Sequence, residues 1–433
     1  MTLTVLTPPL RRAVSSHTGI VRTLDECLSS PGEPRLFRMI CEVAGADALL
    51  GSPLAHVTGI GGAGATRAEA ACAAVGEALE RYSASFVPRE AFVVASAREL
   101  GASAVDPARF ALFSERQHAT AGFPFRRFDA DTRIAWVEGR GLPRGDRFWL
   151  PAELVYLGEA GIGERPIGYA TSSGTACAET LGEALARGLC ELLERDAFMI
   201  VWASQLSLPL LSWSGEPRFV ELDERYFAST GLEYAAVDLS PFHRVPSVLG
   251  VVRAPEGCAG ALGVGAGTAA TVERAWFKAL AEAFAARAAG VKLALLDGRD
   301  YGPRGEDVAS FEDHIRFYSN HARVGPAAFL DGSAARTSTA EIPNLEGDVV
   351  EALCRRVRAA GSSAYAVDVT SPDVAELGLV VTKVIAPELC ALDVAHGARF
   401  LGGRRLYEAG AALGLRDDVL AEDDVNPYPH PFP

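Results

Sequence analysis

Three segments of the chain combine a helical spacing of apolar residues with many small residues. They cover residues 69–81, 183–195 and 268–287, where Ala, Leu, Val, Cys and Gly fill many of the positions. An apolar stripe that recurs every three to four residues is typical of a helix that buries one face against a core. The pattern therefore predicts three largely buried helices.

Shorter apolar runs predict strands between and after these helices. Residues 148–151 form a strand-like run that continues into 152–156, and residues 234–269 favour two or three strands. Further on, a helix is predicted over 348–360 and strands over 363–369 and 378–385. This order of elements predicts an α+β fold with mixed sheets.

The chain shows no linker-like stretch that would divide it into independent domains. We therefore expect one domain over residues 18–433, preceded by a poorly ordered lead-in over residues 1–17. Residues 296–342 have the least regular pattern and contain Gly, Pro, Arg, Asp and Ser throughout. Such a segment is expected to be a mobile lid or a partner contact.

The first two helices repeat one arrangement of acidic residues, Glu-x-x-Glu-Arg with a further Glu eight residues upstream. At about 100° per residue, positions 8 and 11 apart lie within about 80° of one helix face. A row of carboxylates on an apolar helix is costly to bury without cations. A single copy of this motif would indicate ordinary ion pairs on a helix surface. Two copies instead predict a bound Mg²⁺ ion that is also coordinated by phosphate oxygens. The two sets are Glu69, Glu77, Glu80 and Arg81, and Glu183, Glu191, Glu194 and Arg195.

Small residues precede each of the three helices. They are Gly59, Gly61, Gly62 and Gly64 before the first, Ser172, Ser173 and Gly174 before the second, and Gly263, Gly265 and Gly267 before the third. Free backbone N–H groups at such starts can meet an anion, so we expect a polyphosphate held between helices. No Gly-Lys-Ser/Thr follows the glycines, which excludes a Walker A loop. In the third helix, Glu282 and Arg287 alone favour a surface pair.

The composition of the chain argues against several classes of protein. A net charge of −14 argues against a nucleic-acid surface, which needs clustered Lys and Arg. No apolar run predicts a signal peptide or a membrane span. The eight cysteines contain no Cys-x-x-Cys, so neither a zinc site nor a disulfide framework is indicated. We expect a cytoplasmic protein with no membrane partner, and a homodimer is an open alternative to a monomer.

The last eight residues, NPYPHPFP, place proline at alternate positions. Alternating proline cannot form a helix or a central strand and favours an extended polyproline II rod. One interpretation is a floppy end or a ligand for another protein. The other is a rigid rod, 426–433, that sets the carboxylate of Pro433 at a fixed depth in a cleft.

Taken together, these features resemble the YcaO family of ATP-dependent enzymes that modify peptide backbone amides. The resemblance covers roughly residues 18–433. It rests on the two Glu-x-x-Glu-Arg helices, the Ser-Gly-x-Ala run 173–176, the helix ending at Arg287, and Arg299-Asp300. It also rests on the stretch YAVDVTSPDVAELGLVVTKVIAPEL, the run 400–407 (FLGGRRLY), and the Pro-x-Pro-x-Pro ending.

The resemblance implies a YcaO-type nucleotide-binding fold with acidic helices around an ATP site. It implies Mg²⁺ ligands at Glu77, Glu80, Glu191 and Glu194, nucleotide contacts at Ser173, Glu179, Glu183, Arg195 and Arg287, and catalytic roles for Pro429, Pro431 and Pro433. This chain has Ala73 where the family often has Ser, and Glu179 where it often has Gln. Ribose or phosphate contacts therefore differ from the usual set.

The resemblance further implies ATP-dependent phosphorylation of a backbone amide oxygen, which forms thiazoline or oxazoline from Cys, Ser or Thr of a ribosomally made precursor peptide. Alternatives are backbone thioamidation with a TfuA-type partner and a non-catalytic nucleotide-binding scaffold. We expect a separate partner protein, either leader-peptide-binding or of the TfuA type, because no segment outside the resemblance has room for a peptide clamp.

Overall fold

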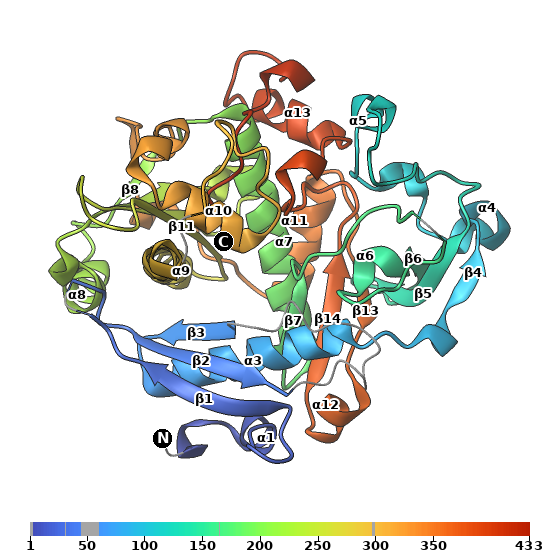
Figure 1. Cartoon of the computed structure of the whole chain (residues 1–433), viewed down its shortest axis with the longest axis horizontal. Helices are drawn as coiled ribbons and strands as arrows, with labels where there is room; N and C mark the ends of the chain where they lie inside the picture. The colour runs from blue at the N-terminus through green and yellow to red at the C-terminus, as the bar shows by residue number, and fades with distance from the viewer. Residues whose placement is uncertain (1–2, 31, 45–59, 164, 297–298) are drawn as a thin grey trace. The chain divides into compact units, whose positions relative to one another are not determined.

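The computed structural model describes residues 3–30, 32–44, 60–163, 165–296 and 299–433, which form two compact units (Figure 1). The first unit comprises Met1–Leu28, Phe37–Leu192 and Leu353–Leu389. The second comprises Ser29–Leu36, Leu193–Ala352 and Cys390–Pro433. Each unit mixes helices with strands, so the expected α+β class is confirmed. Helices α7 (Leu181–Ser204) and α11 (Val349–Ala359) each begin in one unit and end in the other.

In the first unit, helix α3 (Arg67–Ser85) lies on a three-stranded antiparallel sheet (Figure 1). The sheet has the order β1 (Val21–Cys27), β2 (Phe37–Val43), β3 (Ile60–Gly64). A Cβ atom on Gly62 or Gly64 would collide with the backbone of Ala70. These glycines therefore let the helix approach the strand backbone, and we find no anion cradle in them. Gly59 lies outside the described residues.

A second sheet of the first unit holds six strands in antiparallel pairs. Its path is β4-β5-β13-β14-β7, and β6 pairs with β5. The strands are β4 (Val93–Ala95), β5 (Ile134–Gly141), β6 (Asp146–Pro151), β7 (Thr175–Ala178), β13 (Tyr365–Asp368) and β14 (Val380–Ile385). Short helices in this unit are α1 (Pro8–Arg12), α4 (Ala97–Leu100), α5 (Glu115–Ala119), α6 (Ala152–Val155) and α12 (Pro372–Glu376). The strands predicted over 363–369 and 378–385 thus lie side by side, with β14 in the interior of the sheet.

The second unit contains a five-stranded sheet of order β11-β10-β9-β8-β12. Its strands are β8 (Leu210–Ser212), β9 (Glu233–Asp238), β10 (Ser247–Arg253), β11 (Leu262–Thr268) and β12 (Arg336–Ser338). Helix α9 (Val272–Leu296) packs on β11 and β10, and α8 (Pro217–Tyr226), α10 (Phe311–Tyr318) and α13 (Arg404–Ala412) complete the unit. A Cβ atom on Gly263, Gly265 or Gly267 would collide with the backbone of α9. The third run of small residues is therefore also a packing surface.

Two expectations about order are wrong. The lead-in contains α1, and Leu6, Leu10 and Ala13 are buried in the same core as α3, so this part is packed. The irregular segment 296–342 contains α10, whose Phe317 and Tyr318 are each 1% exposed in the core of the second unit. Buried aromatic side chains stabilise this part of the segment and contradict a mobile lid. The predicted boundary at residue 18 stays a prediction.

Candidate functional site

The carboxylates of Glu77, Glu80 and Glu191 gather in the first unit. Burial raises the pKa of Glu80 well above its usual range, and the negative charges of Glu191 and Glu77 raise it further. Arg81 offsets part of this charge, because its guanidinium NH2 lies 2.9 Å from Glu77 Oε1. Helix α3 and the first part of α7 thus bring together three of the four acids predicted as metal ligands.

Lys383 on strand β14 is a second cation that acts on Glu80 and Glu191. The acidic repeats of the sequence did not point to it. Its side chain is buried, and Nζ donates to the carbonyl oxygens of Thr171 and Ser173, each at 2.6 Å. Burial lowers the pKa of Lys383 to about 8, although Glu191 and Glu80 act to raise it. A single lysine within an apolar strand run was the signal that could have identified it.

The turn at 172–174 connects this lysine to Glu191. Gly174 has a φ of +81°, and its N–H donates to Glu191 Oε2 at 3.2 Å. The turn leads into strand β7, and α7 begins only after Thr180. The predicted helix start at Ser172–Gly174 is therefore wrong, but its backbone N–H does meet an anion, namely the carboxylate of Glu191.

The fourth acid, Glu194, lies in a cluster of the second unit and is fully buried. Its Oε2 is 3.2 Å from Lys278 Nζ, and its Oε1 is 3.3 Å from the NH1 of Arg195. Glu282 joins this cluster, because its Oε1 is 3.6 Å from Lys278 Nζ and burial raises its pKa. The interpretation of Glu282 and Arg287 as a surface pair is wrong, since Arg287 donates to the carbonyl oxygen of Ala259 instead.

The remaining acidic residues predicted for the site either cap a helix or are exposed. Glu69 forms a capping box with Thr66 at the start of α3, so its carboxylate binds backbone N–H groups. Glu183 is exposed and pairs with Arg187 one turn later, and Glu179 is exposed just before α7. The row of three carboxylates predicted on each helix is therefore reduced to Glu77 and Glu80 on α3, and to Glu191 and Glu194 on α7.

The Pro-rich tail is anchored within the second unit, so the interpretation of a floppy end is wrong. A polyproline rod makes no hydrogen bonds of its own, which leaves its carbonyl oxygens free for other partners. Trp202 Nε1 donates to Tyr428 O at 3.1 Å, and Tyr318 Oη donates to Pro429 O at 2.7 Å. Phe432 is 1% exposed, with the Arg195 guanidinium 4.1 Å from its ring centroid.

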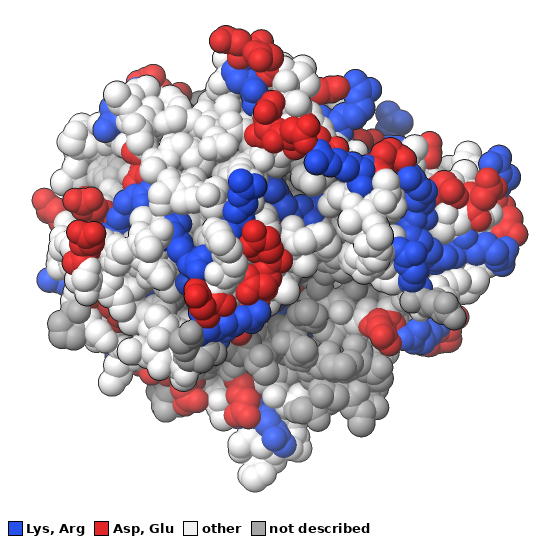
Figure 2. All heavy atoms as spheres, turned by 45° about the horizontal axis from the view of Figure 1, so that its top comes forward, with Lys and Arg blue, Asp and Glu red and all other residues white. Residues whose placement is uncertain are grey.

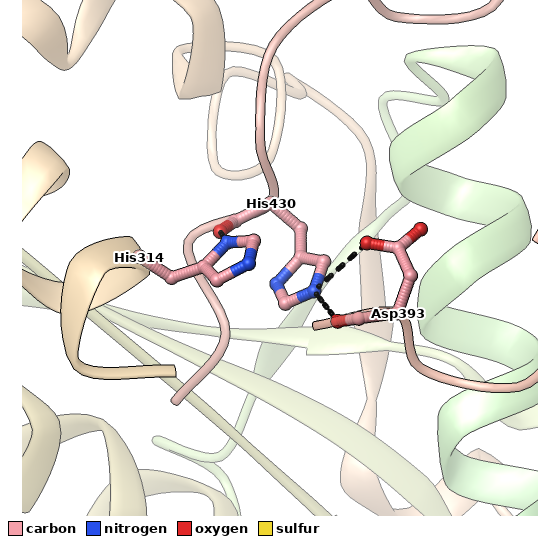
Figure 3. Close-up of side chains that lie close together, drawn as sticks. All are labelled: His314, Asp393 and His430. Atoms are coloured by element: carbon pink, nitrogen blue, oxygen red, sulfur yellow. Dashed lines mark hydrogen bonds and ion pairs between the residues drawn. The ribbon is translucent and has the colours of Figure 1, made fainter. Parts of the chain in front are cut away.

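His314 and Asp393 also hold the tail, because both contact His430 (Figure 3). These three residues form a group of possible metal ligands. Each offers a ligand atom within 4.8 Å of the others, which is compatible with a metal by distance alone. The two imidazole rings, however, are stacked 4.0 Å apart at 10°, and both nitrogens of His314 contact carbonyl oxygens. Imidazole binds a metal in the plane of its ring, so two parallel planes cannot share one ion. The group is an anchor for His430.

Charged side chains of both signs are mixed over the face drawn in Figure 2. Among the described residues of that face, Lys and Arg lie beside Asp and Glu in small groups, so no extended basic surface is visible there. In the described part of the chain, no helix is both long and apolar enough to cross a membrane.

A family model described as "YcaO cyclodehydratase", with ATP and Mg²⁺ binding, matches residues 61–390. Among solved structures, "Heterocyclase in complex with substrate and Cofactor" has a TM-score of 0.80 at 24% identity over 98% of this chain. "Structure of the heterocyclase TruD" has a TM-score of 0.65 at 27% identity over 83% of it. This chain spans only 58% and 50% of those two chains.

A third structure, YcaO from Methanopyrus kandleri bound with AMPPCP and Mg²⁺, has a TM-score of 0.59 at 19% identity. The match covers 88% of this chain and 88% of that chain. Among curated relatives, an uncharacterised protein of Methanothermobacter thermautotrophicus is 25% identical over 77% of this chain and 82% of its own. An uncharacterised protein in the tfuA 3′ region of Rhizobium leguminosarum bv. trifolii is 42% identical over 77 residues, which are 18% of this chain and 17% of that protein.

Proposed function

Because the chain belongs to the YcaO family of ATP- and Mg²⁺-binding cyclodehydratases, we propose that it uses ATP to form thiazoline or oxazoline rings in a ribosomally made precursor peptide. The observation that carries the proposal is the carboxylate cluster of Glu77, Glu80 and Glu191, with the raised pKa of Glu80. The heterocyclases that this chain matches are longer chains, so the substrate and the partners of the whole enzyme are also proposed here.

The carboxylate cluster fits Mg²⁺ by its donor chemistry. Carboxylate oxygens are the hard donors that Mg²⁺ prefers. Burial is the main cause of the raised pKa of Glu80, and the negative charges of Glu191 and Glu77 raise it further, while Arg81 and Lys383 act to lower it. We propose Glu77, Glu80, Glu191 and Glu194 as the metal ligands. When bound, Mg²⁺ would offset the charge of the ATP phosphates during transfer. Ser173, Glu179, Glu183, Arg195 and Arg287 are the proposed nucleotide contacts.

The proposed reaction begins when the thiol or hydroxyl of Cys, Ser or Thr attacks the preceding carbonyl carbon and loses its proton. The carbonyl oxygen, now an oxyanion, attacks the γ-phosphorus of ATP, and ADP leaves. The amide nitrogen then loses its proton, a C=N bond forms, and phosphate departs. Phosphorylation converts a poor leaving group into a good one, so the protein mainly positions the amide oxygen in line with the phosphorus.

The tail 426–433 is proposed to position the substrate or to assist proton removal, with Pro429, Pro431 and Pro433 in the catalytic part. Its anchoring supports this proposal, because a segment held by Trp202 and Tyr318 keeps a defined geometry at low entropic cost. The tail is thus suited to orient a reacting group.

Backbone thioamidation is the second candidate, in which external sulfide attacks the same amide with a TfuA-type partner. It is favoured by the 77-residue match to the protein of the tfuA 3′ region. The third candidate, a non-catalytic scaffold, is disfavoured by the gathered carboxylates. For either reaction we propose a cytoplasmic protein that acts with a separate partner, leader-peptide-binding or TfuA-type, and a homodimer is compatible with this.

The test combines the purified chain, ATP, Mg²⁺, and the precursor peptide and partner encoded beside its gene. Mass spectrometry should show the loss of one water per ring, together with ADP and phosphate. Exchange of one oxygen for sulfur in the presence of sulfide would favour thioamidation instead. If the chain alone modified the peptide as fast as the complete mixture, the proposed partner requirement would be wrong.

A further inference from the structure

Lys383 is a buried cation whose hydrogen bonds are directed at backbone. It is 4% exposed and stands on the interior strand β14, flanked by β13 and β7. Its ammonium group bridges the carbonyl oxygens of Thr171 and Ser173, at 2.6 Å from each. Two carbonyl dipoles that converge on one point repel each other unless a cation lies between them. The conformation of this turn therefore depends on Lys383.

The same turn is held on its other side by the acid cluster. The carbonyl oxygen of Gly174 accepts from Val384 N–H at 2.8 Å, and the N–H of Gly174 donates to Glu191 Oε2. A Cβ atom on Gly174 would collide with Val384 O, and one on Gly188 would collide with Gly174 O. The turn is thus tightly packed between β14 and α7. A continuous set of contacts runs from Lys383 through the turn to the carboxylate of Glu191.

We propose that Lys383 is a positioning residue for Mg²⁺–ATP binding. Its ammonium group fixes the conformation of the 171–174 turn. In this conformation the N–H of Gly174 orients the Glu191 carboxylate, and Ser173 is held beside that carboxylate. The inference rests on the proposed function, since Glu191 is a proposed metal ligand and Ser173 a proposed nucleotide contact. Lys383 itself need not touch the nucleotide. Its hydrogen bonds are made to the protein backbone.

A competing role makes the opposite prediction. If Lys383 only offset the negative charge of Glu80 and Glu191, its removal would leave the cluster more negative. Divalent cations would then bind more tightly to Lys383→Met, and Lys383→Arg, which keeps the charge, would bind normally. Under the positioning role both variants bind more weakly. Methionine lacks the donors, and the planar guanidinium cannot place one atom between the two carbonyl oxygens.

The experiment measures two quantities in Lys383→Met and Lys383→Arg. Hydrogen exchange of the apo protein should be faster in the peptide over residues 171–175 in both variants. Calorimetry with Mg²⁺–AMPPCP should show an affinity lower by about tenfold, because the binding-competent conformation of the turn is then less populated before the ligand binds. Thr382→Val is the matched control, since Thr382 is the neighbouring buried residue and its hydroxyl has no hydrogen-bond partner among the described residues.

The outcomes separate this inference from the proposed function. Wild-type protein that fails to bind Mg²⁺–AMPPCP contradicts the proposed function itself. Wild-type binding with unchanged or tighter binding in Lys383→Met, or with unchanged exchange of 171–175 in both variants, overturns the positioning role. If Lys383→Met does not fold, Lys383→Arg, which retains the buried charge, decides the question by the same two measurements.

Discussion

The guanidinium of Arg195 lies 4.1 Å from the ring centroid of Phe432, so the acidic helix α7 and the Pro-rich tail are in direct contact. The sequence presents these two segments as separate motifs, more than two hundred residues apart. Phe198, three residues further along α7, also packs on Phe432, with ring centroids 4.8 Å apart. Phe432 is therefore the side chain that fixes the end of the tail to the helix that carries Glu194.

Replacing Phe432 tests how much the tail adds to stability. We expect Phe432→Ala to lower the free energy of unfolding by about 3–5 kcal/mol, because a fully buried aromatic ring is removed. Phe432→Leu should cost only about 1–2 kcal/mol, since it keeps most of the apolar volume and loses the cation–π contact. Urea denaturation measures both values. Equal, small effects in the two variants would show that the tail is not held by this ring.

Glu191→Gln tests the proposed metal site. The fold should be retained, because the amide keeps the shape and can still accept from Gly174 N–H. Affinity for Mg²⁺–AMPPCP should fall by on the order of tenfold to a hundredfold when a ligand loses its charge. Glu408→Gln on α13 is a control, since Glu408 forms an i, i+4 pair with Arg404 like that of Glu77 with Arg81. Calorimetry that finds unchanged affinity in Glu191→Gln would refute the assignment.

The raised pKa of Glu80 predicts a dependence of stability on pH in metal-free protein. A carboxyl group with a raised folded-state pKa favours folding while it is protonated, and this contribution is lost as the pH rises above its ordinary value of 4.5. We expect Glu80→Gln to be more stable than wild type at pH 8 without Mg²⁺, with a smaller difference at pH 5. Thermal unfolding at both pH values measures it. A destabilised variant at pH 8 would contradict the cause given for the shift.

His430 predicts a second pH dependence, of opposite direction. Burial lowers its pKa from 6.5 to about 3, and the neutral ring accepts from Phe432 N–H through Nδ1 while Nε2 contacts Asp393 O. The unfolded chain therefore takes up a proton that the folded chain does not, and stability falls between pH 6.5 and 3. His430 alone should contribute about 1.4 kcal/mol per pH unit to this slope, and the buried His314 and His396, whose pKa values burial also lowers, add to it. His430→Asn should flatten this slope, and His17→Gln, at an exposed position, should leave it unchanged.

The local sequence pattern was sufficient to predict the three long helices and to identify the two pairs of acidic residues. The spacing of apolar residues predicted α3, α7 and α9, because helical periodicity is a property of neighbouring residues. The repeated Glu-x-x-Glu-Arg signature predicted a metal site from Glu77, Glu80, Glu191 and Glu194, and the structure brings the first three of these acids together. The signature overestimated the acidic rows, because Glu69 lies at a helix start, where its carboxylate caps the backbone instead.

The roles of the small residues and of the buried Lys383 depend on contacts between segments that are distant in the sequence. A run of glycines reads the same in an anion-binding loop as in a strand beneath a helix, and the close approach of α3 and α9 selects the second use. Lys383 contacts Thr171 across 212 positions of sequence. Local composition determines which segments form helices and strands. A contact between distant segments depends on how those elements pack, so Lys383 acquires its role only when β14, β7 and α7 come together.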